Sequence, residues 1–275
     1  MSMTQWQKTR QETGLALEAR GAADGTDGRA AVRMTEVSKV YGRGSAALLA
    51  LDKVSLTVAS GEFVCLIGAS GCGKSTLLSL VAGLDEPTAG TISTDGGRVS
   101  LMFQEPALFP WLTASRNVEL ALRARGVPRP QLRQRAAELL ETVHLGGFGG
   151  KRPHELSGGM RQRVALARAL AQDADVLLMD EPFGALDAMT RDLLHDELER
   201  ICGTQTLTVL FVTHNVREAV RLGDRVIVLS SRPGQVIDEY RVPRRGPRRI
   251  DSVEVAELAS QITDRLREEM SRHGD

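Results

Sequence analysis

The residues with the clearest chemistry form one glycine-rich loop, Gly68-Ala69-Ser70-Gly71-Cys72-Gly73-Lys74-Ser75-Thr76. Glycines carry no Cβ, so backbone amides in such a loop can converge on phosphate oxygens. Lys74 can reach the β- and γ-phosphates of a nucleotide, and the Ser75 hydroxyl can bind Mg²⁺. The spacing matches a nucleotide phosphate-binding loop in full. A nucleoside triphosphate with Mg²⁺ is therefore the predicted ligand.

Two adjacent carboxylates, Asp180 and Glu181, follow the apolar run Val176 to Met179. Asp180 is a candidate ligand of Mg²⁺, through the water shell of the ion. Glu181 can polarise an attacking water as a general base. With a phosphate-binding loop upstream, we interpret this pair as part of the nucleotide site and not as an ordinary strand cap.

Gln104 and His214 also stand where apolar runs end. The carboxyl ends of strands are where α/β sheets bind ligands, so His214 could contact the γ-phosphate and hold the attacking water. The Gln104 amide could bind both Mg²⁺ and water, and so report the nucleotide state to the segment that follows. The other histidines are interpreted as surface or packing residues: His144, His154, His195 and His273.

A second anion site is predicted at Ser157-Gly158-Gly159, in the run Leu156 to Met160. A serine hydroxyl and unhindered glycine amides at the start of a helix bind anions. One of the two phosphate sites must then serve a second molecule or a second subunit.

Tyr41 and Cys72 each leave two interpretations open. The Tyr41 ring could stack on adenine, or it could pack in the core. The Cys72 thiol could make the loop sensitive to oxidation or alkylation, but we favour a residue that only fills a variable position.

Composition sets the wider limits. The 275 residues are 42% hydrophobic and 25% charged, as in an ordinary globular protein, and 35 basic residues balance 35 acidic ones. A nucleic-acid partner is therefore not predicted. Three cysteines indicate reduced thiols rather than a disulfide framework. No apolar run is long enough for a membrane helix and Met1 to Arg20 lacks a signal-peptide core, so we expect a soluble protein inside the cell.

Patterning along the chain predicts an α/β fold with a parallel core. Residues 1–31 are read as a disordered leader, 105–171 as a helix-rich segment, and 241–275 as a Pro/Arg-rich turn with one amphipathic helix over Val253 to Ser271. The buried strands are expected at Phe63 to Ile67, Val176 to Met179, Thr208 to Val212 and Val226 to Leu229, with a helix over Met189 to Cys202.

In this order, the motifs resemble the nucleotide-binding subunit of an ATP-binding cassette (ABC) transporter over residues 32–240. The order includes Tyr41, the phosphate loop, Gln104, the Leu156 to Met160 signature, Asp180-Glu181, Ala185-Leu186-Asp187 and His214. Met160 departs from the glutamine usual in that family. The resemblance implies a P-loop NTPase core, an N-terminal antiparallel β part and an inserted helical subdomain at about 105–171.

The resemblance also implies a mechanism and partners. Two copies would pack head to tail, each binding ATP and Mg²⁺ between its own phosphate loop and the other copy's Ser157, Gly158 and Gly159. Asp187 would help couple the two sites. The partners implied are polytopic permease subunits and, indirectly, an extracytoplasmic solute-binding protein, with this chain on the cytoplasmic face of the membrane.

A subfamily is indicated by Phe103-Gln104-Glu105, Leu108 to Thr113 and Asn117-Val118, which are similar to the nitrate, sulfonate and taurine importer ATPases. Aliphatic sulfonates are the leading solutes, followed by taurine and nitrate. Pro110-Trp111 would suit a groove for a permease helix if exposed, or a subdomain core if buried.

Three other classes of protein compete with an importer ATPase. A non-transport ABC protein usually has two cassettes or a long coiled coil, and this chain shows one cassette without sustained heptads. The Leu156 to Met160 run argues against an unrelated P-loop kinase or GTPase. An ABC exporter ATPase remains within the same class of transporters.

Overall fold

The computed structural model describes residues 29–184, 186–204, 206–243, 250 and 252–272. The predicted leader therefore lies outside the described residues except for its last three. The predicted Pro/Arg-rich turn lies outside them over 244–249, as do Ala185 and His273.

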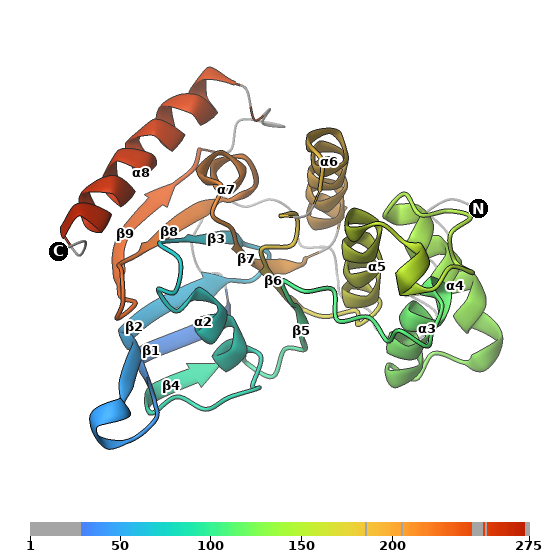
Figure 1. The fold of residues 1–275 in the computed structure, drawn as a ribbon, viewed down its shortest axis with the longest axis horizontal. Helices are drawn as coiled ribbons and strands as arrows, with labels where there is room; N and C mark the ends of the chain where they lie inside the picture. The colour runs from blue at the N-terminus through green and yellow to red at the C-terminus, as the bar shows by residue number, and fades with distance from the viewer. Residues whose placement is uncertain (1–28, 185, 205, 244–249, 251, 273–275) are drawn as a thin grey trace.

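A six-stranded sheet forms the centre of the molecule, in the order β5-β6-β7-β3-β8-β9 (Figure 1). All neighbours are parallel except β9, which runs antiparallel to β8. The strands are β3 (Phe63–Ile67), β5 (Val99–Met102), β6 (Val176–Asp180), β7 (Thr208–Val212), β8 (Arg225–Leu229) and β9 (Val236–Arg241). The predicted α/β fold with a parallel-rich sheet is confirmed.

A second, three-stranded antiparallel sheet has the order β2-β1-β4. Its strands are β1 (Ala30–Tyr41), β2 (Leu48–Ala59) and β4 (Ala89–Ser93), with a short 3-10 helix η1 (Gly44–Ala46) between the first two. Helix α2 (Lys74–Val81) packs its leucines against strands of both sheets. This is the antiparallel β part that the family resemblance implies.

Strand β3 shows how the sequence builds the core. Phe63, Cys65 and Ile67 face one hydrophobic cluster, while Val64 and Leu66 face the other, because successive side chains of a strand point to opposite faces. Both faces are covered, so all five residues are buried. A continuous apolar run is what a doubly covered parallel strand requires.

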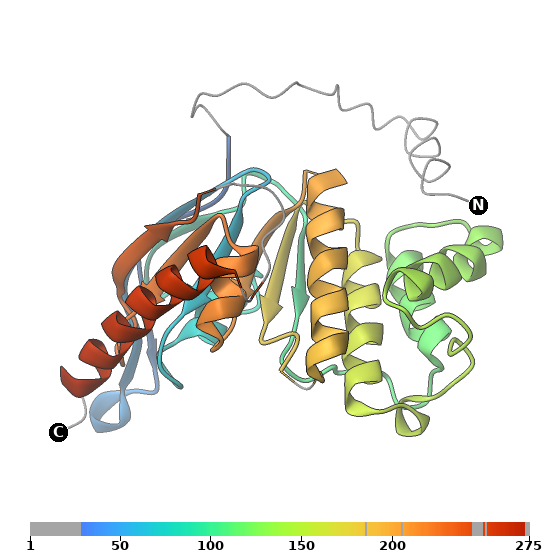
Figure 2. The ribbon, with the colours of Figure 1, turned by 90° about the horizontal axis from the view of Figure 1, so that it is seen from above.

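Three helices lie to one side of the central sheet in two perpendicular views (Figures 1 and 2). They are α3 (Ala114–Ala124), α4 (Arg129–Thr142) and α5 (Gly158–Leu170), with a 3-10 helix η2 (Pro153–Glu155) before α5. They fall within 105–171, although the division into domains stays a prediction. Thr113 caps α3 by accepting a hydrogen bond from the Arg116 amide at 3.2 Å.

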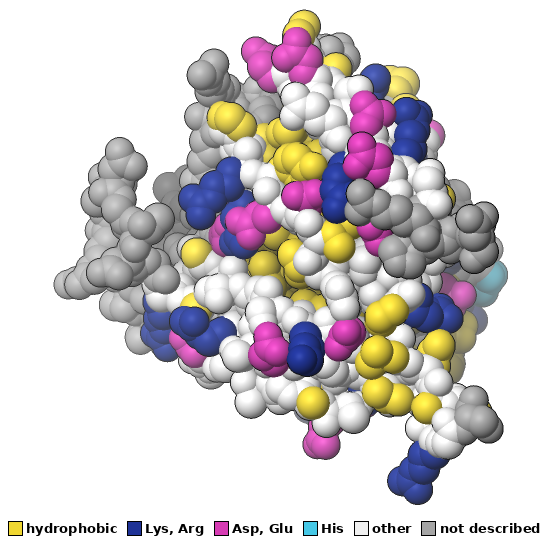
Figure 3. All heavy atoms as spheres, turned by 90° about the vertical axis from the view of Figure 1, so that its left-hand side faces the viewer, with side chains coloured by type: hydrophobic (Ala, Val, Ile, Leu, Met, Phe, Trp, Pro, Cys, Tyr) yellow, Lys and Arg dark blue, Asp and Glu magenta, His cyan; other side chains and the backbone are white. Residues whose placement is uncertain are grey.

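The remaining helices are α6 (Ala188–Thr204), α7 (Val216–Leu222) and α8 (Val253–Arg272). Helix α8 packs against α7, and its Arg265 donates to Asp238 of β9 at 2.6 Å. On the side of the molecule that α8 borders, basic and acidic side chains are interspersed (Figure 3). Among the described residues, no helix is long and apolar enough to cross a membrane.

The sheet topology decides where the polar residues gather. The phosphate loop follows β3, Asp180 ends β6 with Glu181 directly after it, and His214 follows β7. Because these parallel strands are adjacent in the order β6-β7-β3, their carboxyl ends lie at one edge of the sheet. Gln104 follows β5, next to β6, and joins the same edge.

Candidate functional site

The loop between β3 and α2 has the backbone that its glycines predict. Gly73 has φ +102° and Gly71 has φ +75°, in the left-handed region where glycine is favoured. A Cβ on Gly73 would come within 2.9 Å of the Ala50 carbonyl oxygen. Glycine is therefore required there both by conformation and by the close approach of β2.

Lys74 is held inside this loop. Its Nζ donates to the carbonyl oxygens of Gly68 and Ala69 at 2.8 and 2.9 Å, and lies 3.6 Å from the Cys72 sulfur. Phosphate oxygens would take the place of these acceptors with a stronger, charge-assisted bond. The Cys72 side chain is buried, which favours a residue that only fills a variable position over a thiol open to oxidation or alkylation.

A cavity of about 300 Å³ opens in front of the loop. It unites the loop with residues from three other segments that the sequence singled out. The lining residues are Tyr41, Leu48, Ala50, Ser70, Gly71, Gly73, Lys74, Ser75, Thr76, Gln104, Asp180, Glu181 and Arg232.

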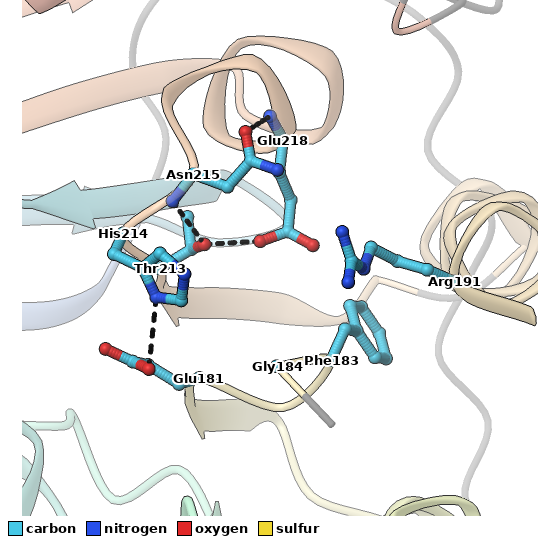
Figure 4. A pocket seen from close by; sticks show the side chains of 8 residues that line it. All are labelled: Glu181, Phe183, Gly184, Arg191, Thr213, His214, Asn215 and Glu218. Carbon is cyan, nitrogen blue, oxygen red and sulfur yellow. Dashed lines mark hydrogen bonds and ion pairs between the residues drawn. The ribbon is translucent and has the colours of Figure 1, made fainter. Parts of the chain in front are cut away.

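Glu181 stands at the centre of the predicted catalytic group. Its Oε2 accepts a hydrogen bond from Gln104 Nε2 at 3.3 Å. The same oxygen lies 3.1 Å from His214 Nδ1 (Figure 4). Glu181 also has φ +44°, which is uncommon for a residue with a side chain. The structure thus brings together Gln104, Glu181 and His214, three residues from three separate strand ends.

Gln104 also connects this site to the helical segment. While its side chain contacts Glu181, its carbonyl oxygen accepts a hydrogen bond from Gln162 Nε2 of α5 at 2.9 Å. The Gln162 side chain is buried, and its hydrogen bond to Gln104 is partly buried. A displacement at Glu181 can therefore reach α5 through a single residue.

The residues proposed to hold Mg²⁺ fit a cation. Burial raises the pKa of Asp180, and the neighbouring Glu181 charge raises it further, while a hydrogen bond with Ser75 and the charge of Lys74 oppose the rise. A half-buried carboxylate destabilised in this way gains from a divalent cation beside it. Asp180, Ser75 and Gln104 all line the same cavity and offer the oxygen ligands that Mg²⁺ prefers.

Tyr41 is 39% exposed and lines the cavity, so the core-packing interpretation is wrong. Its hydroxyl donates to Asp85 at 3.2 Å, and Lys39 Nζ lies 5.0 Å from the ring centroid. Lys39 also bonds Asp85 at 2.6 Å, and this bond is the main reason that the pKa of Asp85 is lowered. The ring is thus fixed at its hydroxyl end, beside a space in which a base could stack.

Ser157, Gly158 and Gly159 do not line this cavity. They begin α5, where exposed Ser157 caps the helix by accepting a hydrogen bond from the Met160 amide at 3.2 Å. The anion site predicted there is therefore presented outward, away from the phosphate loop of the same chain.

Some residues at the site were missed in the sequence. Arg232 lies between β8 and β9, lines the cavity and donates to the Gly71 carbonyl oxygen at 3.1 Å. His195, interpreted as a surface or packing residue, is fully buried and hydrogen-bonded to Glu218 close behind Glu181 and His214. No motif marks either residue, because β8 and α6 bring them into place from distant parts of the chain.

Similarity to known proteins agrees with this geometry. Residues 51–184 match the ABC transporter family. The chain is 45% identical over 218 residues to the nitrate import ATP-binding protein of Synechocystis, covering 77% of this chain and 82% of the relative. It is 49% identical over 212 residues to the taurine import ATP-binding protein of Burkholderia pseudomallei, covering 74% and 82%. It is 46% identical over 246 residues to an aliphatic sulfonates import ATP-binding protein of Mesorhizobium japonicum, covering 87% and 90%.

A solved structure is similar over its whole length. The dimeric structure of a bacterial ABC transporter cassette superposes with a TM-score of 0.73 at 36% identity, covering 78% of this chain and 99% of that one.

The fold and the site thus define a P-loop ATPase of the ABC cassette type, and the chain belongs to the ABC transporter family. Within that family it is an ATPase of an import system, in the group whose relatives are named for nitrate, taurine and aliphatic sulfonates. The resemblance read from the motifs is confirmed.

Proposed function

We propose that this chain hydrolyses ATP in a head-to-tail dimer and thereby energises an importer of aliphatic sulfonates. One observation carries the proposal. The phosphate loop, Asp180 and Glu181 meet at one cavity, whereas Ser157 is exposed at the start of α5 and contributes nothing to that cavity. A second copy would supply the missing anion site.

The proposed chemistry follows from the contacts at the cavity. Lys74 and the amides of the phosphate loop bind the β- and γ-phosphates. Ser75, Asp180 and Gln104 hold Mg²⁺, which when bound neutralises charge on the phosphate oxygens. Glu181 accepts a proton from a water molecule, and the oxygen of that water attacks the γ-phosphorus. The bond between the γ-phosphorus and the oxygen that bridges to the β-phosphate breaks. ADP and phosphate are the products.

Two further residues would place the reactants. His214 contacts Glu181 through Nδ1, so its Nε2 is available to the γ-phosphate. The Tyr41 ring would stack on adenine. Ser157, Gly158 and Gly159 of the second copy would close on the γ-phosphate, and ATP would favour the closed dimer until hydrolysis reopens it. Asp187 would couple the two sites.

The proposed permease contact lies near Trp111, whose side chain is 68% exposed, so the buried-core interpretation is wrong. Buried Asn117 fixes the preceding loop: its Oδ1 accepts from the Phe109 amide at 2.9 Å and its Nδ2 donates to the Thr113 carbonyl at 3.0 Å. A rigidly held, exposed tryptophan suits an interface anchor. We place the chain at the cytoplasmic face of the membrane, bound to permease subunits. An extracytoplasmic solute-binding protein would deliver the solute to those subunits.

Replacing Ser157 with arginine tests the role of the second copy. We expect monomeric chains to bind ATP within about twofold of the wild type, because Ser157 is absent from their cavity. The ATP-dependent dimer and hydrolysis should be lost, because a long side chain would occupy the position of the γ-phosphate. Equilibrium ATP binding and size-exclusion chromatography measure the two effects.

Ser271→Arg, which changes another exposed serine, on α8, is the matched control and should leave dimerisation and hydrolysis unchanged. Weakened ATP binding by Ser157→Arg monomers would refute the proposed role across the dimer.

The proposal of aliphatic sulfonates as the solute rests on the motifs Phe103 to Glu105, Leu108 to Thr113 and Asn117-Val118. The relatives named for aliphatic sulfonates, taurine and nitrate are similar to the chain at 46%, 49% and 45% identity. A strain lacking the protein should fail to grow with an alkanesulfonate as sole sulfur source and should grow normally on sulfate. The wild-type gene should restore growth and the Glu181→Gln variant should not. A defect confined to taurine as sulfur source, or to nitrate as nitrogen source, would reassign the solute.

A further inference from the structure

A chain of buried polar side chains lies directly behind Glu181 and His214. It consists of Arg221, His195, Glu218 and Thr213, each no more than 6% exposed. None of the four lines the nucleotide cavity. Buried polar groups cost free energy unless they are hydrogen-bonded, so an ordered arrangement of this kind calls for a physical reason.

The hydrogen bonds converge on the Glu218 carboxylate from two sides. Arg221 Nη1 lies 3.2 Å from His195 Nδ1, and His195 Nε2 lies 2.7 Å from Glu218 Oε1. Since a guanidinium only donates, Nδ1 accepts and the Nε2 proton is donated to Glu218. The Thr213 hydroxyl donates to the other oxygen of the Glu218 carboxylate. Every bond is thereby satisfied by a neutral imidazole.

The same network holds the backbone on both sides of His214. Thr213 Oγ1 accepts from the Asn215 amide at 3.0 Å, and Asn215 Oδ1 accepts from the Glu218 amide at 3.3 Å (Figure 4). The His214 side chain itself is 68% exposed. A cavity of about 40 Å³ is lined by His214, Thr213 and Glu218 together with Glu181 and Phe183, so the network and the catalytic pair meet at one small space.

His195 also touches the segment that carries Glu181. Its ring meets Phe183 edge to face, with centroids 5.2 Å apart. Phe183 is two residues after Glu181. One buried imidazole on α6 therefore contacts the loop of Glu181 through Phe183 and the loop of His214 through Glu218.

We infer that His195 and Glu218 are positioning residues that set His214 against Glu181 through Thr213. The inference rests on the proposed catalytic roles of Glu181 and His214. Neither positioning residue lines the nucleotide cavity. Their loss should slow the chemical step and leave ATP binding unchanged, a division that loss of general stability would not produce.

Two threonine-to-valine substitutions, one at the start of β7 and one directly after it, test this inference in the full-length chain. Thr213→Val removes the hydroxyl that bonds Glu218, and kcat should fall about tenfold or more, because small misplacements of catalytic groups are costly. The KM for ATP and equilibrium ATP binding should stay within about twofold. Thr213→Ser keeps the hydroxyl and should retain kcat.

Thr208→Val is the matched control. Thr208 is also buried, at the opposite end of β7, where its hydroxyl oxygen accepts only from the Gly61 amide at 3.0 Å. It should lower the melting temperature as Thr213→Val does, yet leave kcat unchanged. An equal loss of kcat in both valine variants, or in neither, would overturn the inference.

A second pair of variants, His195→Gln and His195→Leu, tests His195 itself. Glutamine presents both a donor and an acceptor and should retain kcat, whereas leucine presents neither and should lower it. Should His195→Leu fail to fold, the threonine variants decide the question. The His214→Ala variant distinguishes the proposed catalytic role of His214 from the positioning role of His195 and Glu218. Full activity of this variant would refute the proposed role of His214 itself. Low activity in His214→Ala beside unaffected His195→Leu and Thr213→Val would overturn only the positioning role.

Discussion

Replacing Glu181 with glutamine is expected to stop ATP turnover while ATP still binds. The carboxylate lies 3.1 Å from His214 Nδ1 and 3.3 Å from Gln104 Nε2, so an amide of the same shape can remain in place. What it loses is the ability to accept a proton from water. General bases contribute on the order of 10²- to 10⁴-fold, and a loss of that size should be measured in kcat.

A second consequence of Glu181→Gln follows from the proposed dimer. If ATP closes the two copies and hydrolysis opens them, the variant should accumulate as an ATP-bound dimer on size-exclusion chromatography. Glu138→Gln makes the same chemical change at an exposed position of α4 and should behave as the wild type. An unchanged rate of hydrolysis in Glu181→Gln would exclude Glu181 as the base.

Replacing Lys74 with alanine is expected to weaken ATP binding itself. The ammonium group is nearly buried within its loop and is placed where phosphate oxygens would lie. Hydrogen bonds to charged groups contribute about 1.5 to 3 kcal/mol, so the Kd for ATP should rise roughly 10- to 100-fold. Titration of the monomeric chain with ATP in an isothermal calorimeter measures this directly.

Lys151→Ala is the control for that experiment. Lys151 is exposed and pairs with Glu155 at 3.2 Å on the surface, so its removal takes away one charge without touching the cavity. ATP binding at wild-type affinity by Lys74→Ala, together with lost turnover, would show that Lys74 acts on the transition state alone.

Local motifs predicted most of the site because its chemical groups lie in short segments of the sequence. The loop after β3, the carboxylates after β6 and the histidine after β7 each follow a buried apolar strand, and parallel strands must bring such positions to one edge. The contacts of Gln104 and His214 with Glu181 follow from that single rule of topology.

The residues that support the site, His195 and Arg232, could not be predicted from motifs in this way. His195 is one polar position on α6, and it becomes part of a network only because α6 packs beside α7, where Glu218 and Arg221 lie. Arg232 reaches the phosphate loop because β8 is paired with β3. Packing of this kind depends on the relative placement of distant elements, which no spacing along the chain records.

The left-handed backbone conformation of Glu181 affects which substitutions evolution would favour at this position. At φ +44°, a residue with a side chain costs about 1 to 2 kcal/mol relative to one that adopts this conformation freely. Glycine would relieve that cost and would remove the carboxylate with it. Selection for stability alone would therefore favour the inactive sequence at this position. With glutamate at this position, the fold gives up stability at the residue where the proposed reaction takes place.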